Sequence, residues 1–256
     1  MIFQTDQDDL EEGAKVKKHF KIDGVISDTA GIKVLEIKRP LMPAVKNTYE
    51  DIPGVEGSIL VDSEYDDFKI DVRCALVFKD FKNPSAKRLE LRKVKRFLRI
   101  RDTRFKLSFY DEEGYYYEAN IDAHTFDERF FFEEFTITFI CRPFLFTDEV
   151  FTKTGEGITL TLEQGGDYVA LPNIIILSKT DVSNFTIDVN DRVFKISQIK
   201  ANVPITIDSE VLTVKEGDNH IENLIHGYFP IFENSNTITF SHVVQYNISY
   251  HERYLP

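Results

Sequence analysis

The sequence predicts a mainly β protein with one helix, organised as two modules. The first sign is a strand with one buried face, because apolar residues alternate with polar ones from Phe135 to Cys141. The second is a single stretch of helical spacing that opens at Asn83. The third is a succession of short strand-like runs beyond Pro143, separated by turns and without helical spacing. We therefore expect modules at 1–144 and 145–256, the second a β-sandwich.

Composition sets the broad class. The chain has 256 residues, a net charge of −12, 22 Phe, 11 Tyr and no Trp. A net charge this negative argues against a general binder of nucleic acid or anionic membranes. No run approaches the roughly 20 apolar residues of a membrane-spanning helix, and the acidic N-terminus lacks the apolar core of a signal peptide. We therefore expect no membrane contact and folding in a reducing cytoplasm.

The two cysteines, Cys74 and Cys141, lie in strand patterns and form no Cys-x-x-Cys spacing. Such isolated cysteines are typical of small buried apolar groups. We expect neither a disulfide nor a metal site from them.

Several strands and turns are expected in the first module. Short strands are predicted at 19–22 and 31–37, and a strand with one apolar face at 68–78. Between them Ile52-Pro53-Gly54-Val55-Glu56-Gly57 predicts a turn, in which Gly54 and Gly57 can adopt positive φ angles.

The helix has recognisable start signals. Asn83 is a candidate N-cap, and Pro84 suits the first helical position. Its apolar face is expected to contain Leu91, Val94 and Leu98. Ala86 and Phe97 lie close to the same side.

A cluster of positive charge accompanies this helix. Between Lys87 and Lys106 ten basic residues stand against Glu90 and Asp102. The pattern fits a solvated helix face and strand edge, or a positive surface that meets the acidic surface of a neighbouring copy. A nucleic-acid surface is less favoured, because no groove-reading motif accompanies the charge. Candidate interface residues are Arg39, Arg73, Arg88, Arg92, Arg96 and Arg99.

The end of the first module is predicted as a hairpin followed by the alternating strand. The runs 105–110 and 115–121 flank the turn-forming cluster Asp111-Glu112-Glu113-Gly114. Pro143 is expected to stop the next strand, since proline offers no N–H to a ladder.

The second module is predicted to consist of short strands with turns at Gly165-Gly166-Asp167, Asn190-Asp191 and 216–219. The expected strands are 158–162, 173–177, 185–189, 193–197, 205–208, 211–214, 237–241 and 244–250.

No catalytic or metal-binding constellation is found in the sequence. The six histidines show neither His-Glu-x-x-His nor His-x-His spacing, and no serine lies in a Gly-x-Ser-x-Gly elbow. The glycine pairs lack the Lys-Ser/Thr that follows in a P-loop. We therefore predict no enzyme activity, no cofactor and no metal.

Several segments together resemble the distal tail protein (Dit) family of long-tailed phages and prophages. They are Phe20–Gly24, Gly31–Val34, Ile37–Pro40, Ile52–Gly57, Lys106–Asp111, Tyr116–Ala119, Phe139–Phe144, Ile205–Glu210, Gly227–Pro230 and Asn236–Phe240. Their order and spacing cover most of residues 20–256. Two departures are Phe97-Leu98, where a tryptophan is expected, and Asn234-Ser235, where a Pro-Gly turn is common.

The resemblance implies a structural hub at the tip of a virion tail, assembled in the bacterial cytoplasm. The first module would form a hexameric ring, and a galectin-like β-sandwich would project from it. The ring would join the tail tube protein to the tail-associated fibre or lysin protein, and in some cases to a receptor-binding protein. DNA would pass through its centre without specific binding. The alternative is a carbohydrate-binding or glycan-processing β-sandwich, which the absence of tryptophan disfavours.

Overall fold

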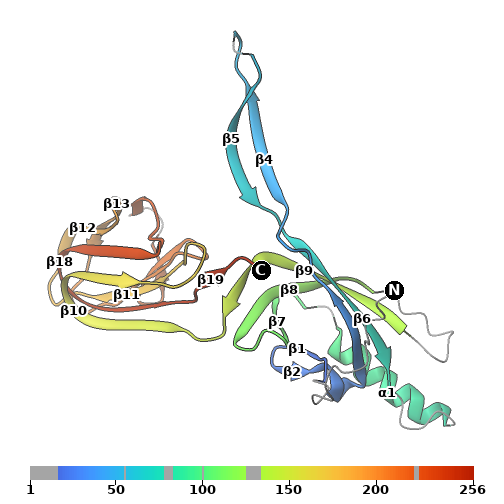
Figure 1. Ribbon diagram of the computed structural model, residues 1–256. Coiled ribbons are helices and arrows are strands. Elements are labelled where there is room, and N and C mark those ends of the chain that lie inside the picture. The colour runs from blue at the N-terminus through green and yellow to red at the C-terminus, as the bar shows by residue number, and fades with distance from the viewer. Residues whose placement is uncertain (1–16, 55, 78–82, 100, 125–133, 222–224) are drawn as a thin grey trace, which may run out of the picture. The chain divides into compact units, whose positions relative to one another are not determined.

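The computed structural model describes residues 17–54, 56–77, 83–99, 101–124, 134–221 and 225–256 (Figure 1). Parts of three sequence predictions lie outside these residues: the acidic N-terminal segment, Val55 of the glycine turn, and the end of the strand at Phe78. The mainly β fold is confirmed, and the described residues contain one α-helix.

The chain divides into two compact units that interleave along the sequence. The first comprises residues 1–39, 70–113 and 120–139; the second comprises 40–69, 114–119 and 140–256. Three strands, β6, β8 and β9, contribute residues to both units. A single module boundary at residue 144 stays a prediction.

The first sheet has the strand order β2-β1-β7-β8-β9-β6-β3, and β19 also pairs with β9. Most of its members come from the first part of the chain, whereas β19 comes from the C-terminal end. Their bounds are β1 Phe20–Ile22, β2 Val25–Ile26, β3 Ile32–Lys38, β6 Phe68–Leu76, β7 Phe105–Phe109, β8 Tyr115–His124, β9 Glu134–Thr147 and β19 Arg253–Tyr254.

The core of the first unit is aromatic. The ring of Phe20 lies 5.5 Å from that of Phe139 and 5.8 Å from that of Phe97, and Phe105 meets Phe139 edge to face. Such tilted pairs are a favourable arrangement of ring quadrupoles. The rings of Phe20 and Phe139 are fully buried, so this cluster fixes β1, β9 and the helix in one core.

The alternating strand is confirmed, but the prediction that Pro143 ends it is wrong. Phe135, Ile137, Phe139 and Cys141 are all buried, as the alternation predicts. β9 nevertheless continues to Thr147, and β19 pairs with it through Leu145 and Phe146. A proline removes one N–H donor, yet its fixed φ remains compatible with extended backbone, so a strand passes through it where that donor is not required.

The single helix, α1, spans Pro84–Phe97. The side chain of Asn83 accepts hydrogen bonds from the backbone N–H groups of Ser85 (3.0 Å) and Ala86 (3.3 Å), which confirms the predicted N-cap. Of the predicted apolar face, Val94 is buried, whereas Leu91 and the C-cap residue Leu98 are half-buried. Phe97, which was expected close to the same side, is buried. A short 3-10 helix, Ser27–Ala30, lies between β2 and β3 and ends at Gly31, whose φ is +82°.

The sandwich sheet has the strand order β16-β15-β14-β11-β18-β12-β13-β17, and β10 also pairs with β18. It is built from residues beyond Val150. The bounds are β10 Phe151–Glu163, β11 Asn173–Leu177, β12 Val182–Val189, β13 Arg192–Ile199, β14 Ile205–Asp208, β15 Thr213–Glu216, β16 Asn219–His220, β17 Ile225–Gly227 and β18 Ser235–Tyr250.

One long strand, β18, joins the two layers of the sandwich. Residues 245–249 of β18 pair with β11, whereas residues 238–240 pair with β12. Its ladder with β10 is interrupted between Gly157 and Thr159. The strands predicted at 237–241 and 244–250 are therefore one strand, because an irregularity of this kind bends a ribbon without ending it.

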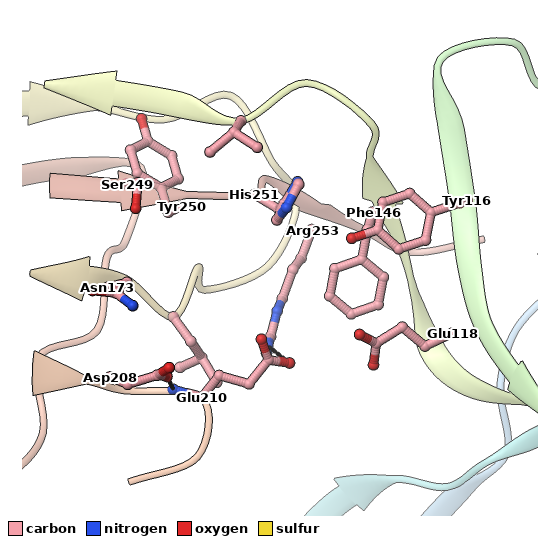
Figure 2. Close-up of a pocket in the computed structure, with 12 residues that line it drawn as sticks. Tyr116, Glu118, Phe146, Asn173, Asp208, Glu210, Ser249, Tyr250, His251 and Arg253 are labelled. Carbon is pink, nitrogen blue, oxygen red and sulfur yellow. Dashed lines mark hydrogen bonds and ion pairs between the residues drawn. The ribbon is translucent and has the colours of Figure 1, made fainter. Parts of the chain in front are cut away.

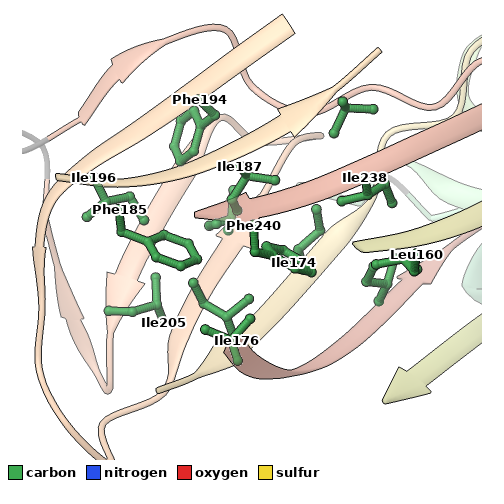
Figure 3. Close-up of a cluster of buried hydrophobic side chains, with 14 of the residues drawn as sticks. Leu160, Ile174, Ile176, Phe185, Ile187, Phe194, Ile196, Ile205, Ile238 and Phe240 are labelled. Carbon is green, nitrogen blue, oxygen red and sulfur yellow. The ribbon is translucent and has the colours of Figure 1, made fainter. Parts of the chain in front are cut away.

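The sandwich encloses one hydrophobic cluster (Figure 3). Phe185, Phe240, Ile174 and Ile187 are fully buried in it, and the rings of Phe185 and Phe240 stack at 6.3 Å. Alternate positions of β11, β12 and β18 supply these side chains, as expected for strands that each bury one face.

Turn chemistry explains two further outcomes. Asn190 and Asp191 both have positive φ (51° and 66°) between β12 and β13, which confirms the predicted two-residue hairpin turn. The strand predicted at 211–214 instead begins at Thr213. Leu212 has φ +54°, and the carboxylate of Asp208 accepts hydrogen bonds from the N–H groups of Glu210 and Val211, so these residues form a turn.

Both cysteines are buried, as predicted, and they form no disulfide. Burial raises the pKa of the Cys74 thiol to about 12, so the thiolate that reacts with alkylating reagents is scarce at neutral pH. We expect no alkylation of the native protein by maleimide at pH 7, and modification of both cysteines in denaturant. Mass spectrometry checks this, and rapid labelling of the folded protein would contradict the burial.

Candidate assembly surfaces

A two-stranded ribbon of β4 (Val45–Asp51) and β5 (Ser58–Tyr65) forms the third sheet (Figure 1). Every residue of β4 is exposed, and so is every residue of β5 before Tyr65. Six large apolar side chains of the ribbon and its turn are 44–56% exposed: Val45, Tyr49, Ile52, Ile59, Leu60 and Val61. An isolated two-stranded hairpin is marginal in water, and clustered exposed apolar residues mark interaction surfaces. The ribbon is therefore a candidate assembly surface.

Aromatic packing anchors the base of the ribbon. Tyr65 meets Phe144 and Tyr168 edge to face, at 6.2 and 6.1 Å between ring centroids. Phe144 and Tyr168 stack at 4.4 Å, and the guanidinium of Arg253 lies 5.6 Å from the Phe144 ring. At the end of the ribbon away from its turn, the N–H of Asp66 donates a hydrogen bond to the carbonyl of Ala44. The ribbon therefore starts from a fixed base although its strands are exposed.

The predicted turn residues Pro53, Gly54 and Gly57 lie between β4 and β5. Gly54 has φ +87° and Gly57 has φ +82°, which confirms the glycine turn. The strands on either side were not predicted. Their side chains face solvent on both faces, so no apolar–polar alternation identifies them.

The basic helix presents a different surface. Arg88, Arg92 and Arg96 are exposed on α1, and Arg99 is exposed just beyond its C-terminus. The structure thus brings four of the six candidate interface arginines to one helix and its C-terminal extension. Their role in an interface stays a prediction.

The other two candidate arginines already have partners within the first unit. Arg39 forms a two-pronged pair with Asp111 (3.0 and 2.8 Å) and lies 4.4 Å from the Phe109 ring centroid. Arg73 pairs with Glu36 at 3.6 Å and with Glu134 at 3.3 Å. A sequence cannot separate such internal pairs from free surface charge, because the partner carboxylates are far away along the chain.

The Arg39–Asp111 pair makes a pH prediction. Hydrogen bonding to Arg39 lowers the pKa of Asp111 from its ordinary 3.8. A lowered folded-state pKa stabilises the fold above the unfolded-state pKa, and this stabilisation is lost as the pH falls through the folded-state value. We expect Asp111→Asn to unfold at lower urea than wild type at pH 7, and the gap to close below about pH 3.8. If the difference in unfolding urea concentration between variant and wild type stays constant with pH, the charge of Asp111 contributes nothing to the stability of the fold.

A hollow of about 230 Å³ lies in the second unit (Figure 2). Carboxylates of Glu118, Asp208 and Glu210 line it together with Arg253. Figure 2 shows the side chains of Arg253 and Glu210 pointing toward one another, and their charged atoms are 3.5 Å apart. Tyr116, Phe146 and Tyr250 also line the hollow but are each at most 6% exposed. It therefore lacks the open, flat aromatic face on which a sugar stacks.

The charges around this hollow form a network. Arg142 donates to Glu118 at 2.7 Å and to Glu210 at 2.8 Å. Burial disfavours the charge of Arg142, but the hydrogen bonds that it donates to these two carboxylates raise the pKa of its guanidinium above the ordinary value. Burial lowers the pKa of Arg253, and the charge of Glu210 partly offsets this. Arg142, Arg253, Glu118 and Glu210 thus compensate one another's charges.

The described residues contain no cluster of three or more His, Cys, Asp or Glu that could hold a metal ion. The ring nitrogen Nδ1 of His251 lies 2.7 Å from the carbonyl of Thr147, and that of His19 lies 3.0 Å from the carbonyl of Lys17. Within the described ranges, no helix is long and apolar enough to cross a membrane.

Two comparisons define the class of protein that this fold resembles. Residues 31–141 match the model of the phage tail protein RIFT-related domain. The match covers the strands β3 to β8, the ribbon and α1, together with most of the alternating strand. No curated protein matches the chain.

Among solved structures, the chain is similar to the SPP1 Dit (gp 19.1) protein, described as a paradigm of the hub adsorption apparatus in phages that infect Gram-positive bacteria. The TM-score is 0.70 at 15% identity, over 93% of this chain and 99% of that one. Two structures of the phage P2 baseplate in its activated conformation, with Ca and with Sr, give TM-scores of 0.46 and 0.43 at 9% and 11% identity. They cover 92% and 91% of this chain, and 98% and 97% of theirs. The predicted resemblance to distal tail proteins is confirmed, and the fold is that of SPP1 Dit.

Proposed function

We propose that this protein is a structural hub at the distal end of a phage tail. Six copies form a closed ring that connects the tail tube protein to the tail-associated fibre or lysin protein. DNA passes through the ring without specific binding. The shared fold with SPP1 Dit and the phage tail domain match at residues 31–141 support this role. The role is one of assembly and passage, without catalysis.

The exposed ribbon is the observation that carries the proposal. Within a single chain it leaves both sheet edges and six large apolar side chains in contact with water. A neighbouring copy that covers the ribbon would bury the exposed half of these side chains, which is worth about half of the ~1.5–3 kcal/mol that full burial of each provides. In a closed ring every ribbon lies against a neighbouring copy. A head-to-tail contact gives such a ring when the rotation that relates successive copies adds up to a full turn.

Charge is compatible with the same arrangement. The chain is acidic overall, whereas the helix region is basic, so two copies present complementary surfaces to each other. An acidic protein also repels DNA phosphates, which favours passage over binding.

Negative-stain electron microscopy of the purified full chain tests this proposal. We expect uniform ring-shaped particles with a central channel. Fields of single, separate chains, or open filaments, would contradict the closed ring.

A further inference from the structure

A second hollow, of about 400 Å³, lies in the first unit between α1 and the β1–β2 region. Its floor is apolar, made by the buried side chains of Ile22, Ala30 and Phe97. Val25, which also lines it, is 51% exposed. A hollow with this lining accepts an apolar side chain, because filling it removes both surfaces from water.

Four cations line the same hollow: Lys93, Arg96, Arg99 and Arg101. The only carboxylate in its lining is Asp23, which already pairs with Arg101 at 3.3 Å. In the described part of the chain, Lys93, Arg96 and Arg99 form no ion pair. The hollow therefore fits an apolar side chain that is flanked by carboxylates.

The chain itself contains such a segment. Residues 8–12 are Asp-Asp-Leu-Glu-Glu, in which one leucine stands between two pairs of carboxylates. The carboxylates of this segment complement the charges of Lys93, Arg96 and Arg99, and its leucine complements the apolar floor. Complementary charges on the segment and on the rim of the hollow favour this segment over others and fix its alignment in the hollow.

The first described residues lead toward the hollow. The ammonium group of Lys17 lies 2.6 Å from the carboxylate of Asp28, and the next residue, Thr29, lines the hollow. Leu10 lies seven positions before Lys17, a span of at most ~25 Å when extended. Leu10 can therefore reach the hollow of its own chain.

We propose that residues 8–12 dock into this hollow of the same chain, with Leu10 over Phe97 and the carboxylates on the basic rim. The docked segment covers Lys93, Arg96 and Arg99, whereas Arg88 and Arg92 lie outside the hollow and stay available to a neighbouring copy. The contact is an ionic one within a single chain, and high salt weakens it.

Disulfide trapping in the full chain tests the proposal. Gln7→Cys and Val25→Cys place one thiol beside the docked segment and one at the hollow. Cys74 and Cys141 are buried and are not expected to react. Mild oxidation at low micromolar concentration is followed by non-reducing electrophoresis and peptide mapping. We expect a rapid bond within one chain.

Matched variants separate docking from chance collisions. In the trapping background, Lys93→Glu/Arg96→Glu is expected to slow the bond by roughly fivefold, since it reverses two contacts of an exposed ionic site. Arg88→Glu/Arg92→Glu changes the charge of the same helix equally but outside the hollow, and should leave the rate unchanged. Leu10→Ser should slow it as well.

Equal rates of disulfide formation in the two double charge variants would overturn the proposal. The rate would then depend only on the length of chain between the two cysteines and not on docking. A bond formed mainly between chains would also overturn it. Neither outcome depends on ring formation, so this test and the microscopy of the ring can fail separately.

Discussion

Replacing Ile59 and Leu60 together with aspartate is expected to weaken assembly by at least ~100-fold in dissociation constant, or about 2.7 kcal/mol. Successive residues of a strand point to opposite faces, so this double variant places a charge on each face of the ribbon. Whichever face meets a neighbouring copy, an unpaired carboxylate is then buried there, which costs several kcal/mol. Sedimentation velocity over a dilution series measures the dissociation constant.

The matched control is Val211→Asp/Val243→Asp. Both valines are exposed to a similar degree (62% and 53%) but lie in the sandwich and its loops. All four positions are solvent-facing, so neither variant should lower the melting temperature noticeably. An unchanged dissociation constant in the ribbon variant would exclude the ribbon as an assembly surface.

Phe240→Ala is expected to destabilise the sandwich by about 3–5 kcal/mol, a large share of the stability of an ordinary domain. Phe240 is fully buried on β18, where its ring stacks on Phe185 at 6.3 Å and on Tyr246 at 5.6 Å. The truncation removes these contacts and leaves a cavity that close-packed neighbours fill only in part. Urea unfolding followed by circular dichroism measures the loss.

Val243→Ala on the same strand is the control. Its side chain is 53% exposed, so its truncation should cost well under 1 kcal/mol. If the two variants unfold at the same urea concentration, the cluster around Phe240 is not the core that holds the sandwich together.

The strands that the sequence predicts best are those that bury one face. Phe135–Cys141 and Phe68–Leu76 alternate strictly, because each is wet or polar on one side and packed on the other. The helix is predicted equally well, since Asn83 and Pro84 are local signals that need no tertiary context.

The ribbon shows where prediction from sequence ends. Lys46, Asn47, Thr48, Glu50 and Asp51 give β4 no apolar face, and a strand without a buried face has no period to detect. Only its turn, with Gly54 and Gly57, has a local signature. The continuation of β9 through Pro143 was missed for a related reason, because β19, which pairs with Leu145 and Phe146, comes from the distant C-terminal end of the chain.

The six candidate interface arginines differ in the same way, according to whether their surroundings are local or distant in sequence. Arg88, Arg92 and Arg96 share a helix, so their common surface follows from helical spacing. The internal roles of Arg39 and Arg73 depend on Asp111 and Glu134, which are distant in sequence and become neighbours only in the folded sheet. Likewise, the hollow beside Phe97 combines β1, β2 and the end of α1, a juxtaposition that no single motif encodes.

The mass of the particle in solution tests the central claim most directly. Light scattering coupled to size-exclusion chromatography of the full chain should give a single species near six times 29.7 kDa at micromolar concentration. A clean 29.7 kDa species under the same conditions would contradict the ring, and with it the proposal that the exposed ribbon is covered by a neighbouring copy.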